Sequence, residues 1–158
     1  FEIDGTEHAL TSSAPADSAI VSLDVSRDGA RLLLYLSTPL GPRLAVAGII
    51  RDQKNVPTAL GQLEYLPVAS NAPIDATWVD ARTVATVSRG GEVAPVTLYE
   101  IGGPSATFGQ VPDASTIVGG NGGADGLRVL RTSGEVLRPQ GSSWVTTGLS
   151  ARVLATKQ

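Results

Sequence analysis

Cysteine and methionine are absent from this 158-residue chain, and histidine occurs only once. The lack of cysteine excludes disulfides, thiolate metal sites and a cysteine nucleophile. A natural chain starts with methionine, so its absence at position 1 predicts a piece of a longer protein or a processed form. The single histidine, His8, lies near no Ser–Asp arrangement, and there is no G-x-S-x-G motif. A serine-hydrolase triad is therefore not expected.

Positive charge and long apolar runs are also scarce. Lys and Arg number 12 against 15 Asp and Glu, and only Lys54 and Lys157 are lysines. Nucleic-acid binding needs a dense run of positive charge, so no nucleic-acid partner is expected. The longest apolar run, around Leu32–Leu36, has the length of a strand and falls far short of a membrane span. Aromatic residues make up only 4% of the chain, so the core must consist mainly of Val, Leu, Ile and Ala.

Glycine and proline are abundant instead, with 18 and 10 residues scattered along the chain. This composition favours a globular protein with many turns. The clearest local pattern is Ile20–Leu36, in which two apolar runs flank the polar break Ser26–Gly29. Asp-Gly between two apolar runs is a strong hairpin signal, because both residues tolerate a left-handed backbone. The stretch therefore predicts a β-hairpin.

The remaining apolar runs are short and repeat in groups of four. A strand–turn–strand pattern starts before Ser26, again before Val79 and again before Gly119, at spacings of 53 and 40 residues. Four short strands per roughly 40–50 residues are typical of a β-propeller blade, with a β-sandwich as the alternative. The predicted strands are 20–25, 32–36, 43–50 and 62–66, then 74–78, 83–88, 96–101 and 106–111, then 116–118, 127–131, 135–137 and 143–147, with a last possible strand at 149–156.

This pattern predicts an all-β, propeller-like chain of about three to four blades of four antiparallel strands. Residues 1–18, with short strands at 1–3 and 8–10, are expected to form the end of a preceding blade and a linker. The blades are expected at about 19–70, 71–113 and 114–158. Propellers close with about four to eight blades, so the ring is expected to be incomplete. Open blade edges invite pairing, so self-association or pairing with a further segment is predicted.

Several sequence segments resemble those of one protein family. The turn Val25–Arg31 is similar to the S-x-D-G-x-R turn of extracytoplasmic propellers. Arg43–Asp52, Trp78–Val84 and Gly141–Trp144 resemble strands of the first, second and third blades in the LpqB family of actinobacterial lipoproteins. The resemblance covers about residues 19–148. It rests on strand and turn segments, and none of them is a catalytic signature.

The resemblance implies a lipoprotein attached to the outer face of the cytoplasmic membrane through an upstream lipid anchor that this chain does not contain. It also implies an upstream GerMN-like domain and association with the extracellular part of a two-component sensor kinase of the MtrB type. A non-enzymatic interaction module with no cofactor is therefore the first functional hypothesis. The alternatives are a carbohydrate-binding or glycan-hydrolysing envelope domain, and a purely structural part of a larger propeller.

The residues that bear on these alternatives are few. A glycan hydrolase needs paired carboxylates, and five acids fall at predicted strand ends, where turn and cap roles are the usual explanation: Asp24, Asp28, Asp75, Asp80 and Asp113. Gly119–Asp125 resembles half of a calcium-binding nonapeptide repeat, but it occurs once, so a turn is the expected structure.

Tryptophan provides the candidate partner contacts. Trp78 closes a predicted first strand and Trp144 lies in a predicted fourth strand. Packing between blades is the common use of such residues, whereas an exposed tryptophan is a frequent anchor for a protein partner. Trp78 and Trp144 are thus the candidate partner-contact residues, and no catalytic, cofactor or metal residue is predicted.

Overall fold

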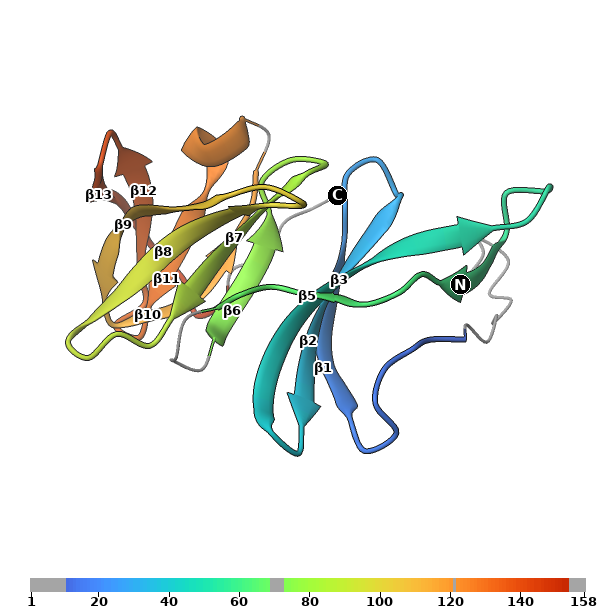
Figure 1. The fold of residues 1–158 in the computed structure, drawn as a ribbon. Helices are drawn as coiled ribbons and strands as arrows, with labels where there is room; N and C mark the ends of the chain where they lie inside the picture. Colours follow the sequence, from blue (N-terminus) through green and yellow to red (C-terminus); the bar gives the residue numbers. More distant parts are fainter. Residues whose placement is uncertain (1–10, 69–72, 121, 154–158) are drawn as a thin grey trace.

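The computed structural model describes residues 11–68, 73–120 and 122–153. It folds into three antiparallel sheets, and its single helical element is a 3-10 turn at Gly123–Gly126. In each sheet the first four strands follow one another in chain order, and in the first sheet a fifth strand pairs with the third (Figure 1). The three sheets do not close a ring, which confirms the predicted incomplete propeller. We call them blade 1, blade 2 and blade 3. The predicted strands at 1–3 and 8–10, and His8, lie outside the described residues.

Blade 1 is built on the predicted hairpin. Its strands are β1 (Ala19–Val25), β2 (Arg31–Thr38), β3 (Gly41–Arg51), β4 (Pro57–Leu60) and β5 (Glu64–Tyr65). The first half of β3 pairs with both β2 and β5, whereas its second half pairs with β4. Strand β3 therefore runs past the edge of the blade and carries β4 on an arm (Figure 1).

The sequence predicted β4 wrongly, as part of a polar connection over residues 51–61. A tight turn makes the strand possible, because the Asp52 side chain accepts hydrogen bonds from the N–H groups of Lys54 at 2.8 Å and Val56 at 2.9 Å. Asn55 takes the left-handed conformation in this turn, with φ 64. The chain then reverses, and Pro57–Leu60 pairs with the second half of β3.

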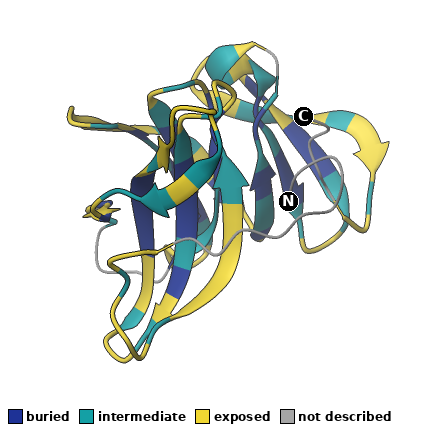
Figure 2. Ribbon diagram, turned by 90° about the vertical axis from the view of Figure 1, so that its right-hand side faces the viewer, coloured by how far each residue is buried: buried dark blue, intermediate teal, exposed yellow. Residues whose placement is uncertain are grey.

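Blade 2 comprises β6 (Pro73–Trp78), β7 (Thr83–Ser88), β8 (Val93–Glu100) and β9 (Ser105–Pro112). Its second strand, β7, is buried along nearly its whole length, since the blade packs on both faces. In the molecule as a whole, buried residues gather in the strands and exposed ones in the turns (Figure 2). Val84, Trp78 and Tyr99 belong to the cluster shared with blade 1. The opposite face packs on blade 3 through a cluster that includes Ala85, Val87, Val96, Val111, Ile117, Leu127, Val129 and Leu137.

Blade 3 comprises β10 (Ala114–Val118), β11 (Arg128–Arg131), β12 (Glu135–Gln140) and β13 (Ser143–Ser150). The separate last strand predicted at 149–156 is wrong. Leu149 and Ser150 end β13, residues 151–153 are not strand, and residues 154–156 lie outside the described part of the chain.

A one-residue bulge marks the first strand of every blade. The pairing register shifts at Val21 in β1, at Ile74 in β6 and at Ser115 in β10. The shared bulge shows that the blades are structural repeats. It also gives a register in which Asp24, Thr77 and Val118 occupy equivalent positions on the three inner strands.

Candidate functional site

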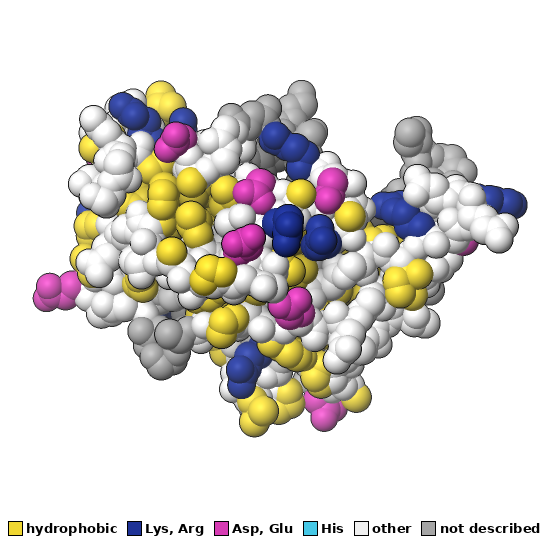
Figure 3. All heavy atoms as spheres, turned by 45° about the horizontal axis from the view of Figure 1, so that its top comes forward, with side chains coloured by type: hydrophobic (Ala, Val, Ile, Leu, Met, Phe, Trp, Pro, Cys, Tyr) yellow, Lys and Arg dark blue, Asp and Glu magenta, His cyan; other side chains and the backbone are white. Residues whose placement is uncertain are grey.

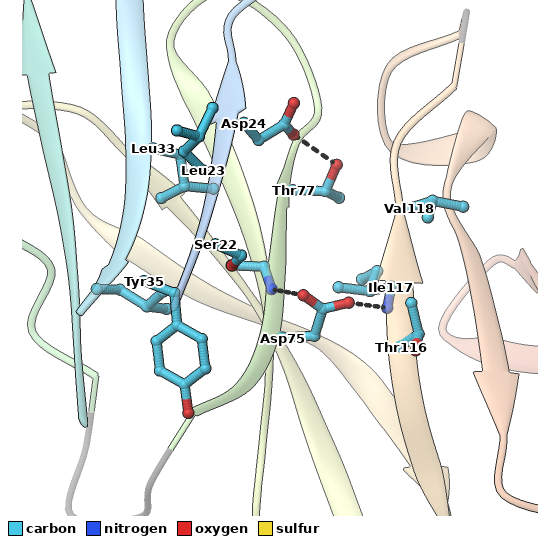
Figure 4. A pocket seen from close by; sticks show the side chains of 12 residues that line it. Ser22, Leu23, Asp24, Leu33, Tyr35, Asp75, Thr77, Thr116, Ile117 and Val118 are labelled. Carbon is cyan, nitrogen blue, oxygen red and sulfur yellow. Dashed lines mark hydrogen bonds between the residues drawn. The ribbon is translucent and has the colours of Figure 1, made fainter. Parts of the chain in front are cut away.

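A cleft of about 270 Å³ lies where the inner strands of the three blades meet (Figure 4). Its polar side chains come from β1, β6 and β10, while β2 and β3 supply its apolar wall. The lining residues are Ser22, Leu23, Asp24, Leu33, Tyr35, Leu44, Asp75, Ala76, Thr77, Thr116, Ile117 and Val118. We call this space the junction cleft. It brings together Asp24 and Asp75, two of the acids that the sequence placed at strand ends.

Asp24 joins blade 1 to blade 2. Its Oδ2 accepts a hydrogen bond from the Thr77 hydroxyl at 3.2 Å and a longer one from the Trp78 backbone N–H at 3.4 Å. The Trp78 indole N–H donates to the Asp24 carbonyl oxygen at 3.1 Å. The carboxylate therefore has donors from the neighbouring inner strand.

Thr77 continues the same pattern from blade 2 to blade 3. Thr77 is buried, with 5% of its surface exposed. Its hydroxyl accepts a hydrogen bond from the Gly119 backbone N–H at 3.0 Å. In the register of the repeats, Asp24 and Thr77 are equivalent, and so are their donors Trp78 and Gly119. Asp24 and Thr77 thus each bind the backbone that follows in the neighbouring blade.

Gly119 is required at this position by close packing. A Cβ built on it would lie 2.1 Å from the Trp78 carbonyl oxygen, far inside van der Waals contact. The sequence pattern predicted a turn at this glycine and gave no indication of its contact with blade 2. The repeat spacing is the signal that could have identified it, because Gly119 and Trp78 directly follow equivalent positions on their strands.

Asp75 is the second acid of the cleft. Its Oδ2 accepts a hydrogen bond from the Ile117 N–H of blade 3 at 2.9 Å (Figure 4). Its Oδ1 accepts a hydrogen bond from the Ala76 N–H at 2.9 Å. Burial raises the pKa of Asp75 and the neighbouring Asp24 raises it further, although the two N–H groups oppose the shift. The cleft thus holds a carboxyl group that takes up a proton more readily than an ordinary aspartate.

The other acids identified in the sequence lie in turns or at the surface. Asp28 accepts the Ser26 hydroxyl at 2.6 Å in the hairpin turn, and this bond is the main cause of its lowered pKa. Asp80 accepts the N–H groups of Arg82 and Thr83, and Asp113 pairs with Arg131 at 3.4 Å. These three act as local turn and surface groups and do not join the cleft.

Trp78 and Trp144 lie at different blade junctions. Trp78 is 6% exposed and packs between blades 1 and 2. A side chain so deeply buried offers a protein partner little surface. Trp144 is half-buried and makes an edge-to-face contact with Phe108 of blade 2, with ring centroids 6.1 Å apart. The role of either residue as a partner contact stays a prediction.

An open groove of about 720 Å³ runs beside Trp144, between β9 and the β12–β13 turn. It is lined by Thr107, Phe108, Gly109, Gln110, Gly141, Ser142, Ser143 and Trp144. We call it the outer groove. Trp144 packs against Gly109, where an added Cβ would lie 2.7 Å from the indole nitrogen. Of the two candidate tryptophans, Trp144 therefore borders a surface that a partner can reach.

Within the described part of the chain, no group of three or more His, Cys, Asp or Glu side chains is placed to hold a metal ion. The glycine-rich stretch 119–125 leads into the 3-10 turn, with Asp125 exposed on it. Acidic and basic side chains alternate over the face seen in Figure 3, and neither sign forms a broad field there.

The comparison with protein families decides the identity. The model of the lipoprotein LpqB β-propeller domain matches residues 2–151. The chain belongs to the LpqB β-propeller family. No match was found among curated proteins or among solved structures. Three sheets of this LpqB-family chain therefore show the blade architecture that its sequence resemblance implied.

Membership in a lipoprotein family indicates an extracytoplasmic location for this LpqB-family chain. Among its described residues, no helix has the length and apolar character needed to cross a bilayer.

Proposed function

We propose that this LpqB-family region is a non-enzymatic protein-interaction module at the outer face of the cytoplasmic membrane. Its proposed partner is the extracellular part of a two-component sensor kinase of the MtrB type, whose activity it modulates. A lipid anchor upstream of this region attaches the protein to the membrane. The family match over residues 2–151 is the observation that carries the proposal.

The outer groove supports this proposal as a contact surface. It combines a half-buried indole with exposed polar neighbours, a combination common where proteins recognise each other. Trp144 is the predicted anchor there. Trp78 is left out of the proposed contact because of its burial.

A glycan-binding or glycan-hydrolysing function is the second candidate, because Asp24 and Asp75 line one cleft. A pair of carboxylates is the catalytic set of most glycoside hydrolases. Here, however, both carboxylates accept hydrogen bonds from the inner strands, which is the role of a structural group. This favours the interaction module, with the three blades also serving as part of a larger propeller.

Binding between purified proteins tests the proposal. The chain is immobilised and titrated with the extracellular domain of the sensor kinase from the same organism. Saturable binding is expected, and Gln110→Arg in the outer groove is expected to weaken it at least about tenfold by placing a long charged side chain at the contact. Glu64→Arg on the exposed strand β5 of blade 1 is the control and is expected to bind normally.

Absence of saturable binding to the kinase domain would contradict the proposed partner. Equal weakening by Gln110→Arg and Glu64→Arg would contradict the outer groove as the contact. Release of reducing sugar from cell-wall glycan by the chain, lost in Asp75→Asn, would favour the second candidate instead.

A further inference from the structure

The junction cleft has two chemically different sides. Its apolar wall comes from blade 1, where Leu33 and Leu44 are buried and Leu23 is 58% exposed. The Tyr35 ring completes this wall, and its hydroxyl donates a hydrogen bond to the Pro73 carbonyl oxygen at 2.8 Å. That bond holds the ring between blade 1 and the start of β6. The wall is therefore a preformed apolar surface that solvent reaches at Leu23.

The other side of the cleft carries the Asp75 carboxylate, which points from β6 into the space between β1 and β10 (Figure 4). Each of its two oxygens accepts one backbone N–H, from Ala76 and from Ile117. A carboxylate oxygen has two lone pairs, so each oxygen keeps the capacity to accept a further hydrogen bond. Asp75 thus combines a fixed position with room for one more donor.

The charge on this carboxylate has no positive partner in the lining of the cleft. Among the described residues, the lining contains no Lys, Arg or His, and the charge that acts on Asp75 is that of Asp24, which has the same sign. Burial and this repulsion raise the pKa of Asp75, because both disfavour its charged form. A cation beside Asp75 would stabilise that form.

Three other classes of ligand fit the cleft less well. An anion would meet the carboxylates of Asp24 and Asp75. A metal ion needs several ligands, and in the described part of the chain no group of three His, Cys, Asp or Glu side chains is placed to hold one. A neutral sugar would bring its hydroxyl groups against the leucine side chains of the wall, which offer them no hydrogen bond.

We propose that the junction cleft binds a small primary amine with an apolar body. The ammonium group donates to the Asp75 carboxylate, and the apolar body packs on Leu23 and Tyr35. The volume of about 270 Å³ lies just below the range of about 300–1,000 Å³ that is usual for drug-sized ligands, so a smaller ligand is expected. This site is separate from the outer groove and does not depend on the proposed kinase partner.

Three probes with the same apolar body test the proposal: phenethylamine, phenethyl alcohol and phenylacetate. Their head groups are cationic, neutral and anionic at neutral pH. Each probe is titrated into the isotopically labelled chain, and NMR follows the N–H signals of Ala76 and Ile117, because both groups bond to Asp75. The amine is expected to shift both signals saturably and to bind at least about tenfold more tightly than the alcohol, whereas phenylacetate shifts neither.

Two variants locate the ammonium group. Asp75→Asn removes the charge and is expected to weaken amine binding at least about tenfold, with alcohol binding unchanged. Leu23→Lys brings an ammonium group of the chain itself to the cleft and is expected to weaken amine binding by a similar factor. Leu149→Lys on β13, where Leu149 is 65% exposed, is the matched control and is expected to bind the amine normally. Circular dichroism confirms folding, and the exposed position of Leu23 keeps the test available if Asp75→Asn does not fold.

Two results would overturn the proposal. One is equal affinity for the amine and the alcohol, which would make the cleft an apolar pocket without charge recognition. The other is amine binding that leaves the Ala76 and Ile117 signals unshifted, or that is as tight in the folded cleft variants as in the natural chain. Either observation would place the amine on another surface.

Discussion

The Thr77 hydroxyl connects the inner strands of all three blades, accepting a hydrogen bond from the Gly119 N–H at 3.0 Å while donating one to the Asp24 carboxylate at 3.2 Å. Asp24 lies on β1, Thr77 lies on β6, and Gly119 directly follows β10. The two hydrogen bonds share the Thr77 hydroxyl, so they form a continuous line across the junction of the three blades. We call it the inner-strand network.

Thr77→Val tests the inner-strand network. Valine has nearly the same shape, but it leaves the buried Gly119 N–H without an acceptor and removes a donor from Asp24. A loss of about 1–3 kcal/mol in the free energy of unfolding is expected, which is typical of a broken buried hydrogen bond. Urea denaturation measures it. Thr58→Val on exposed β4, whose hydroxyl makes one bond of 3.3 Å, is the control and is expected to change the free energy by less than about 0.5 kcal/mol.

Gly119→Ala tests the close approach of blades 2 and 3. The new Cβ meets the Trp78 carbonyl oxygen, so the two backbones must separate. A loss of at least about 2 kcal/mol is expected from overpacking. Gly48→Ala is the matched control, because a Cβ at Gly48 on β3 has no atom within 4 Å. Equal unfolding midpoints for the two variants would contradict this account of Gly119.

The pH dependence of stability tests the environment of Asp75. Its pKa is raised in the native state, so the folded protein holds the proton more tightly than the unfolded chain. The free energy of unfolding therefore falls as pH rises from the unfolded to the folded pKa of this group. Asp75→Asn removes this fall. Its stability relative to the natural chain is expected to improve as pH increases from about 3 to 6, measured by urea denaturation.

Asp28→Asn is the control for this measurement, since the Ser26 hydroxyl lowers the pKa of Asp28. A carboxyl with a lowered pKa stabilises the fold above its unfolded pKa, and this stabilisation is lost as pH falls through the folded pKa. The relative stability of Asp28→Asn is therefore expected to worsen as pH increases. Parallel trends for the two variants would contradict the assigned environments.

Trp78→Phe separates packing from partner binding. Phenylalanine leaves the Asp24 carbonyl oxygen without the indole N–H and leaves space between blades 1 and 2. A loss of about 1–3 kcal/mol in the free energy of unfolding is expected. Affinity for the kinase domain, measured on the folded variant, is expected to stay unchanged. A loss of affinity with intact stability would restore Trp78 as a partner contact.

The sequence predicted the local elements well because their signals are local. The Ser26–Gly29 break formed the expected hairpin turn, in which Gly29 has φ 67 and Asp28 accepts the Ser26 hydroxyl. Strand β4 was missed because it is only four residues long, begins with proline and depends on pairing with β3. Tertiary context decided that element over its composition.

The junction cleft was less predictable because it, too, depends on contacts between segments that are far apart in the sequence. Asp24 and Asp75 were identified as strand-end acids, but nothing local in the sequence shows that their partners lie on other blades. Thr77 and Gly119 were missed because a threonine and a glycine have many roles. Their importance follows only from the register of the repeats.

The chain's only two tryptophans lie at different blade junctions, Trp78 between blades 1 and 2 and Trp144 against blade 2 from blade 3. The molecule therefore carries one natural fluorophore for each junction. In folded Trp78→Phe, tryptophan emission reports on the contact between blades 2 and 3, and in Trp144→Phe it reports on the contact between blades 1 and 2. Comparing the two emission signals during unfolding would show which pair of blades separates first.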